Sequence, residues 1–172
     1  RGQTPLATLL LAGIALGSLN GALVSLILSL SLADYRISGQ IIYWTLGGLD
    51  GRTWDHVKLV APAVLMGSAV IVAYWRDLDA LLLGETQAAA VGVEVAQVRR
   101  LLLIATAIIT GAAVAVSGTI GFVGLVIPHM LRLLLGPGHQ WLLPASLLAG
   151  ATFVVLADLL ARTAIAPEEI RL

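Results

Sequence analysis

The sequence contains no cysteine and little charge. Disulfides and thiolate metal sites are therefore excluded within these 172 residues. Only 12% of the residues are charged and 59% are hydrophobic, whereas a typical soluble domain is about 25% charged. A soluble chain of this length could not hide so much apolar surface from water, so lipid must form part of its solvent. Because the net charge is zero and the ten basic residues are scattered, nucleic acid is not an expected partner.

The sequence patterns of nucleotide-binding and catalytic sites are also missing. The single lysine, Lys58, does not lie in a GxxxxGK[ST] sequence, so we do not expect the chain to bind ATP itself. The hydrophobic runs hold no paired carboxylates and no nucleophile–base set. We therefore expect no enzymatic activity, no cofactor and no metal site.

Four apolar runs have the composition of membrane-spanning helices, which need about 20 residues. We expect these helices at roughly 5–30, 59–75, 101–116 and 141–161. A polar, aromatic-rich connection follows the first run, and we expect it to lie at the membrane interface with a short helix. The sequence thus predicts an all-α, polytopic membrane helical bundle with no soluble domain.

A fifth apolar piece, 125–135, is too short to cross the membrane. As a helix it would extend roughly 16 Å, against a hydrocarbon core of about 30 Å. The preceding stretch, 117–124, contains three glycines, which argue against continuous helix. We expect irregular backbone there, followed by a half-length helix, because such backbone survives at membrane depth when it is buried in protein or lines a cavity. The bundle would then make about five passes, one of them short.

The connection between the second and third runs is predicted to hold two short helices. Asp77 or Asp79 is expected to cap the first, and Gly84 to end it. Glu85 should open the second helix near the positive end of its dipole, and Gly92 should close it. Such a pair of amphipathic helices is a candidate docking site for a partner; the alternative is a plain solvated connector.

Three smaller features have both a structural and a functional interpretation. Gly13, Gly17 and Gly21 recur every four residues and form a face for close helix packing, within the subunit or at a subunit interface. Asp158 and Arg162 stand at i and i+4, so they form either a structural pair or a docking point for an acidic partner. A lone histidine such as His129 is more often structural than a ligand.

Several separated segments resemble the permeases of the FecCD type of ABC importer. The segment 118–132, GTIGFVGLVIPHMLR, resembles the signature of that family. Supporting matches occur at 9–17, 43–48, 83–92 and 156–162. The resemblance covers essentially the whole chain, residues 1–172, which would be a partial transmembrane permease domain.

The resemblance implies a function and a set of partners. Such permeases import iron-siderophores, haem or cobalamin in the bacterial inner membrane. They work with a second permease subunit, cytoplasmic ATP-binding subunits and a periplasmic or lipid-anchored substrate-binding protein, in contact with membrane lipid. This chain would supply the fifth to ninth of ten helices. The loop at about 76–98 would be cytoplasmic; the basic residues, five on each side, leave the orientation open.

The resemblance also assigns roles to residues. Coupling to the ATPase would involve Leu83, Gly84, Glu85, Ala88, Ala89 and Gly92. Arg162 would dock the binding protein, and the helix holding Gly13, Gly17 and Gly21 would line the pathway or pack near the subunit interface. The signature positions are Gly121, Gly124, Pro128 and His129.

Departures from the family pattern keep other interpretations open. The first four helices and the tenth are absent, and the chain ends soon after Pro167-Glu168-Glu169. It begins with Arg1 and has methionine only at Met66 and Met130, so we expect a start upstream of Arg1 and treat the chain as a fragment. An ion-coupled secondary transporter, a channel subunit and a nonfunctional truncated remnant are the alternatives. Ion coupling usually needs ionisable groups at mid-membrane, and the first three runs have none.

Overall fold

The computed structural model describes residues 6–31 and 34–164, and these residues form eight helices and no strand. The departure expected at 167–172 and the residue Arg1 lie outside this described part. Two units are distinguished along the chain, residues 1–46 and 47–172. Each is described by itself.

The first unit contains α1 (Leu6–Leu30) and α2 (Tyr35–Leu46). The predicted start and end of the first helix agree with α1 to within one residue. The expected short helix in the following connection is α2. Asp34 caps it, because its Oδ1 accepts the backbone N–H groups of Arg36 at 3.0 Å and Ile37 at 3.4 Å.

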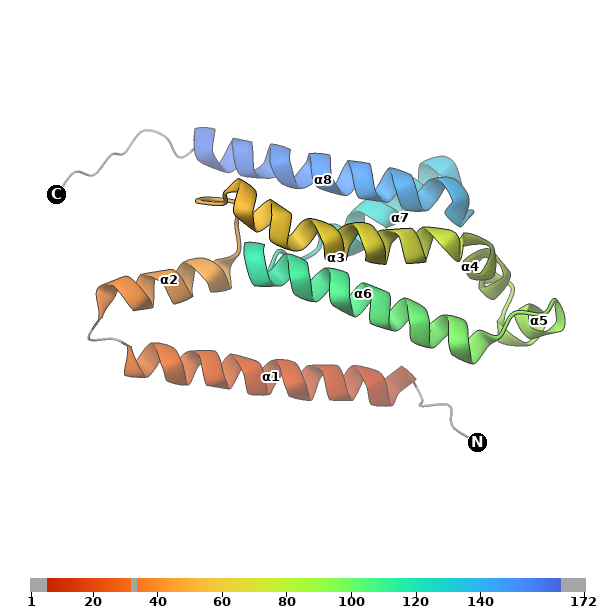
Figure 1. The fold of residues 1–172 in the computed structure, drawn as a ribbon, viewed down its shortest axis with the longest axis horizontal. Helices are drawn as coiled ribbons and strands as arrows, with labels where there is room; N and C mark the ends of the chain where they lie inside the picture. Colours follow the sequence, from red (N-terminus) through yellow and green to blue (C-terminus); the bar gives the residue numbers. More distant parts are fainter. Residues whose placement is uncertain (1–5, 32–33, 165–172) are drawn as a thin grey trace. The chain divides into compact units, whose positions relative to one another are not determined.

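The second unit contains six helices (Figure 1). They are α3 (Trp54–Ala73), α4 (Trp75–Leu82), α5 (Glu85–Ala90), α6 (Val95–Ser117), α7 (Val123–Leu135) and α8 (His139–Ala164). Helices α3 and α6 pack side by side, and α7 packs against α8. The predicted pair of short helices between the second and third spans is present as α4 and α5.

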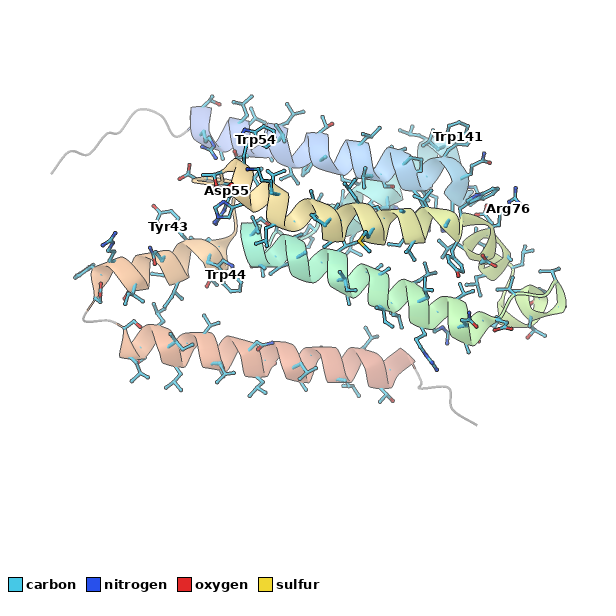
Figure 2. The ribbon with its side chains drawn as sticks, in the orientation of Figure 1. Tyr43, Trp44, Trp54, Asp55, Arg76 and Trp141 are labelled. Atoms are coloured by element: carbon cyan, nitrogen blue, oxygen red, sulfur yellow. The ribbon has the colours of Figure 1, made fainter. Side chains whose placement is uncertain are left out.

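Four helices of the described residues are long and apolar enough to cross a membrane: α1, α3, α6 and α8. Helix α7 has 13 residues, roughly 20 Å of rise, so the expected half-length helix is confirmed. Exposed Trp54 and Trp141 lie at opposite ends of the second unit, and Arg76 lies at the same end as Trp141 (Figure 2). Tryptophan is enriched at membrane–water interfaces, so these residues are suited to the two surfaces of the bilayer.

Two predicted helix starts were wrong because a charge ends a hydrophobic run without ending a helix. Helix α3 begins at Trp54 rather than 59 and includes Lys58, whose Nζ lies 3.2 Å from Asp55 Oδ1. Helix α6 begins at Val95 rather than 101 and includes Arg99. In both helices the charged turn continues the helix beyond the apolar run.

Small residues allow the close packing of α3 and α6. Gly67 is buried, and a Cβ added there would lie 2.5 Å from Cγ1 of Ile109. Ala105 of α6, which is 6% exposed, lies at the same contact, its carbonyl oxygen 3.4 Å from that position. Small residues of this kind let helix backbones approach closely in membranes.

Candidate functional site

The turn between α4 and α5 depends on Gly84. This residue has φ +108°, a conformation that L side chains rarely adopt. An added Cβ would also lie 2.7 Å from Oε1 of Gln87. Leu83 is the C-cap of α4, and Glu85 is the first residue of α5. The predicted roles of Gly84 as a helix end and Glu85 as a helix start are therefore confirmed.

The second turn of this segment is a Schellman cap built on Gly92. Its φ is +92°, its N–H donates to the Ala89 carbonyl at 3.1 Å, and the N–H of Val93 donates to the Ala88 carbonyl at 3.0 Å. Ala89 is exposed, whereas the side chain of Ala88 is fully buried. In this conformation Ala88 supports α5 from inside and does not face a partner.

Helix α5 lies between two exposed apolar residues. Leu83 is 72% exposed and Val91 is 74% exposed, and neither belongs to a candidate membrane span. Glu85 is itself half-exposed and forms an ion pair with Arg99 of α6. The segment thus offers an apolar surface with a carboxylate whose charge is already shared with an internal arginine. Its role in coupling stays a prediction.

The prediction that Asp77 or Asp79 caps the first short helix was wrong. Both residues lie inside α4, whose N-cap is Tyr74. The Oδ1 atom of Asp79 instead accepts the backbone N–H of His139 at 2.8 Å and lies 2.7 Å from the Nδ1 atom of His139. His139 is the first residue of α8 and is 9% exposed. The carboxylate of one helix therefore caps another helix that begins sixty residues later.

These bonds change the acidity of Asp79. The backbone N–H of His139 lowers the pKa of the carboxyl below its ordinary value, while partial burial acts in the opposite direction and the imidazole adds to the lowering. A carboxylate at a helix N-terminus is also favoured by the helix dipole. The carboxylate form of Asp79 is therefore the form that the surrounding structure stabilises.

Arg162 lies near the end of α8 and forms two ion pairs. Its Nε donates to Oδ2 of Asp158 at 2.8 Å, and its Nη1 donates to Oδ1 of Asp50 at 3.0 Å. The expected pairing with Asp158 is present, and Asp50 in the turn before α3 is a partner that the sequence interpretation missed. The Arg162 side chain remains 48% exposed. Its docking role stays a prediction, in competition with two internal carboxylates.

The signature segment forms the irregular backbone that its glycines predict. Helix α6 ends at Ser117, and Gly118 follows with φ +70°. Phe122, the N-cap of α7, has φ +65°, a conformation rarely adopted by a bulky residue, and is 83% exposed. A Cβ at either Gly121 or Gly124 would meet no atom of the described chain within 4 Å. Of the other signature positions, α7 contains Pro128 and His129.

The backbone of Gly47 and Gly48 lies close against the start of this segment. Gly47 has φ +72°, and an added Cβ would lie 2.5 Å from the carbonyl oxygen of Thr119. The N–H of Gly48 donates to the Ser117 carbonyl at 2.8 Å. The turn before α3 is thereby held to the end of α6. In the sequence, the Gly47-Gly48 pair indicates a turn or a close approach of the backbone. It does not indicate which residues the turn would contact.

The remaining predicted positions lie on α1 and in the charge pattern. Within the first unit, Gly13, Gly17 and Gly21 share one open face, since no described atom would lie within 4 Å of an added Cβ. Their packing role stays a prediction. In the described ranges, 6–31 and 34–164, no group of three or more histidine, cysteine or acidic side chains is placed to hold a metal ion.

Comparison with known proteins identifies relatives over nearly all of this chain. It is 46% identical over 161 residues to the cobalamin import system permease protein BtuC of Halobacterium salinarum, covering 94% of this chain and 43% of the relative. It is 43% identical over 169 residues to the hemin transport system permease protein HmuU of Yersinia pestis, covering 98% and 50%. The chain thus spans about half the length of the curated relatives it matches.

A solved structure gives the same result for the fold. The chain matches an inward-facing conformation of a metal-chelate type ABC transporter with a TM-score of 0.86 and 36% identity, covering 95% of this chain and 53% of that one. The relatives are named as transport permeases. With these relatives and four candidate spans among the described residues, the chain is a multi-pass protein of the inner membrane. The FecCD transport family matches residues 1–172, and the chain belongs to that family.

Proposed function

We propose that this chain forms part of the membrane pathway of an ATP-driven importer and couples it to a separate ATPase. The substrate would be an iron-siderophore, haem or cobalamin. Relatives are named for cobalamin and hemin transport, and the iron-siderophore follows from the family resemblance alone. The partners would be cytoplasmic ATP-binding subunits, a second permease subunit and a substrate-binding protein. The chain itself would catalyse no reaction.

The observation that carries this proposal is the α4–α5 segment. It is a compact helical projection outside the candidate spans, joined directly to α3 on one side and to α6 on the other. Its exposed Leu83 and Val91 give it an apolar surface. Because both residues lie outside the candidate spans, a protein partner would cover this surface rather than lipid. A partner that pushes on this segment acts on two spanning helices at once.

Arg162 would serve the opposite side of the membrane. Helix α8 begins at the end of the second unit that holds Arg76 and Trp141, so Arg162 lies near the other end (Figure 2). The ion pairs with Asp50 and Asp158 hold its side chain at that end. An acidic residue of the binding protein would have to compete with Asp50 and Asp158 for this arginine.

The test uses the full-length permease that contains this segment, reconstituted with its ATPase and binding protein in proteoliposomes. We expect ATP-dependent uptake of one of three probes: cobalamin, haem or a ferric siderophore. Glu85→Arg should reduce uptake and co-purification of the ATPase while the protein still inserts into the membrane. Uptake that continues without ATP would contradict the proposal.

A charge swap separates docking from internal pairing. Glu85→Arg also places two like charges side by side, because Glu85 pairs with Arg99. The double variant Glu85→Arg/Arg99→Glu restores an internal pair but leaves an arginine on the partner-facing helix. We expect it to recover folded yield without recovering ATPase association. Full recovery of both would show that Glu85 serves the internal pair alone.

A further inference from the structure

Asp79 joins the α4–α5 segment to a spanning helix that the chain reaches much later. Its Oδ1 accepts two hydrogen bonds from His139, from the backbone N–H at 2.8 Å and from the imidazole Nδ1 at 2.7 Å. The His139 side chain is largely covered, at 11% exposed, and the Asp79 side chain is partly covered, at 31% exposed. Charge-assisted hydrogen bonds are among the strongest in proteins, and shelter from water strengthens them further.

The position of these bonds gives them a mechanical meaning. Helix α4 follows α3 directly, since Tyr74 is both the C-cap of one and the N-cap of the other. Helix α8 starts at His139 and packs along α7, which contains three of the four signature positions, Gly124, Pro128 and His129. Asp79 therefore connects α4 with α8, and through α8 with α7. Neither α7 nor α8 follows α4 directly along the chain.

We infer that Asp79 is a positioning residue that fixes α4 to the start of α8, so that movement of the α4–α5 segment carries α8 and α7 with it. This inference rests on the proposed function. It defines α4 and α8 as parts of one rigid body during transport. The partner of Asp79 in this link is His139, which donates its backbone N–H as well as its ring N–H to the carboxylate.

The charge of Asp79 suits a permanent link rather than a switch near neutral pH. Because its pKa is lowered in the folded protein, its stabilising contribution is fully present above the ordinary aspartate pKa of about 3.9. The contribution is lost as the pH falls through the lowered folded-state value.

The first experiment measures substrate taken up per ATP hydrolysed in the complete reconstituted complex. We expect Asp79→Ala to lower this ratio below that of the wild-type complex. Asp79→Asn keeps an oxygen that accepts the backbone N–H and should restore part of the ratio. Asp77→Ala, which removes an acid two residues away on the same helix, is the matched control and should leave the ratio unchanged.

A merely structural role would give a different result. Folded yield, ATP hydrolysis and uptake would then fall together in Asp79→Ala, and uptake per ATP in the surviving complexes would equal that of the Asp77→Ala control. That outcome overturns the inference. The ratio is measured per hydrolysed ATP, so a lower yield of folded complex does not obscure the result.

The second experiment tests the rigid body directly. These 172 residues contain no cysteine, so Asp79→Cys/His139→Cys introduces one defined pair, which a short bifunctional thiol reagent would link in a background cleared of other cysteines. We expect the linked complex to recover the uptake that the unlinked double variant loses. Each single cysteine variant with the same reagent is the control. Uptake abolished by the link would show that α4 and α8 must separate, and would overturn the inference.

The two proposals fail in distinguishable ways. If Glu85→Arg leaves uptake and ATPase association intact, the proposed coupling segment is wrong. If Glu85→Arg acts as expected while Asp79→Ala keeps normal uptake per ATP, only the link between α4 and α8 is wrong.

Discussion

Gly67 provides the sharpest test of how α3 and α6 pack. A methyl group added there would lie 2.5 Å from Cγ1 and 2.7 Å from Cδ1 of Ile109. Overpacking of this kind typically costs about 1–3 kcal/mol. The substitution also gains helix propensity of about 0.5–1 kcal/mol, since glycine is the poorer helix former. Gly67→Ala should therefore be close to neutral or moderately destabilising by itself.

Gly111→Ala on α6 is the matched control. It brings the same gain in helix propensity, and its added Cβ would meet no atom of the described chain within 4 Å. The difference between the two variants therefore isolates the contact with Ile109. We expect Gly67→Ala to be less stable than Gly111→Ala by about 1–3 kcal/mol, about a 5- to 150-fold difference in the ratio of folded to unfolded protein.

The measurement is thermal unfolding of the full-length permease in detergent, followed by the fraction that stays monodisperse. Gly67→Ala should lose monodispersity at a lower temperature than Gly111→Ala. Ile109→Ala removes the obstructing atoms, so the double variant with Gly67→Ala should be more stable than the two single effects predict. Equal stability of Gly67→Ala and Gly111→Ala, with additive behaviour in the double variant, would refute this account of the helix contact.

Three further substitutions test other parts of the chain. Gly47→Ala adds a side chain at positive φ against a backbone carbonyl, costing at least about 1–2 kcal/mol, so its folded yield should fall well below that of Gly48→Ala, whose added Cβ would meet open space. Gly17→Leu should impair assembly with the second subunit more than Leu10→Ala; equal assembly would place this face against lipid. Arg162→Glu should weaken binding-protein association, and a reciprocal acid-to-base change on that protein should restore part of it; reduced folded yield without rescue would leave a structural role alone.

The spanning helices could be predicted because the partition between lipid and water acts on composition. Runs of apolar residues gave α1 almost to the residue. The starts of α3 and α6 were misplaced because charged side chains such as Lys58 and Arg99 can extend into the aqueous phase from a continuing helix. Hydropathy indicates where the apolar part of a helix ends, whereas the helix boundary itself is set by its backbone hydrogen bonds.

Local turn chemistry was equally readable, and tertiary contacts were not. Gly84 and Gly92 act within their own turns, so their neighbours in sequence were enough to assign α5. Asp79 looked like a cap for its own helix because aspartate favours helix starts. Its actual acceptor role depends on where the start of α8 lies in space, which no local pattern encodes. The same holds for Asp50, whose partner Arg162 is 112 residues away.

Each end of α8 is attached to another element through an aspartate. At each end the charge on or next to α8 also matches the helix dipole. At its start, Asp79 places a carboxylate against the first backbone N–H group, where a negative charge is favoured. Near its end, Arg162 places a positive charge where the carbonyl dipoles favour it, and Asp50 ties that arginine to the turn before α3. Attachment at both ends would let α8 transmit a displacement along its length. Under the proposed function, α8 is therefore the element along which a push at the α4–α5 segment would reach the face on which Arg162 meets the binding protein.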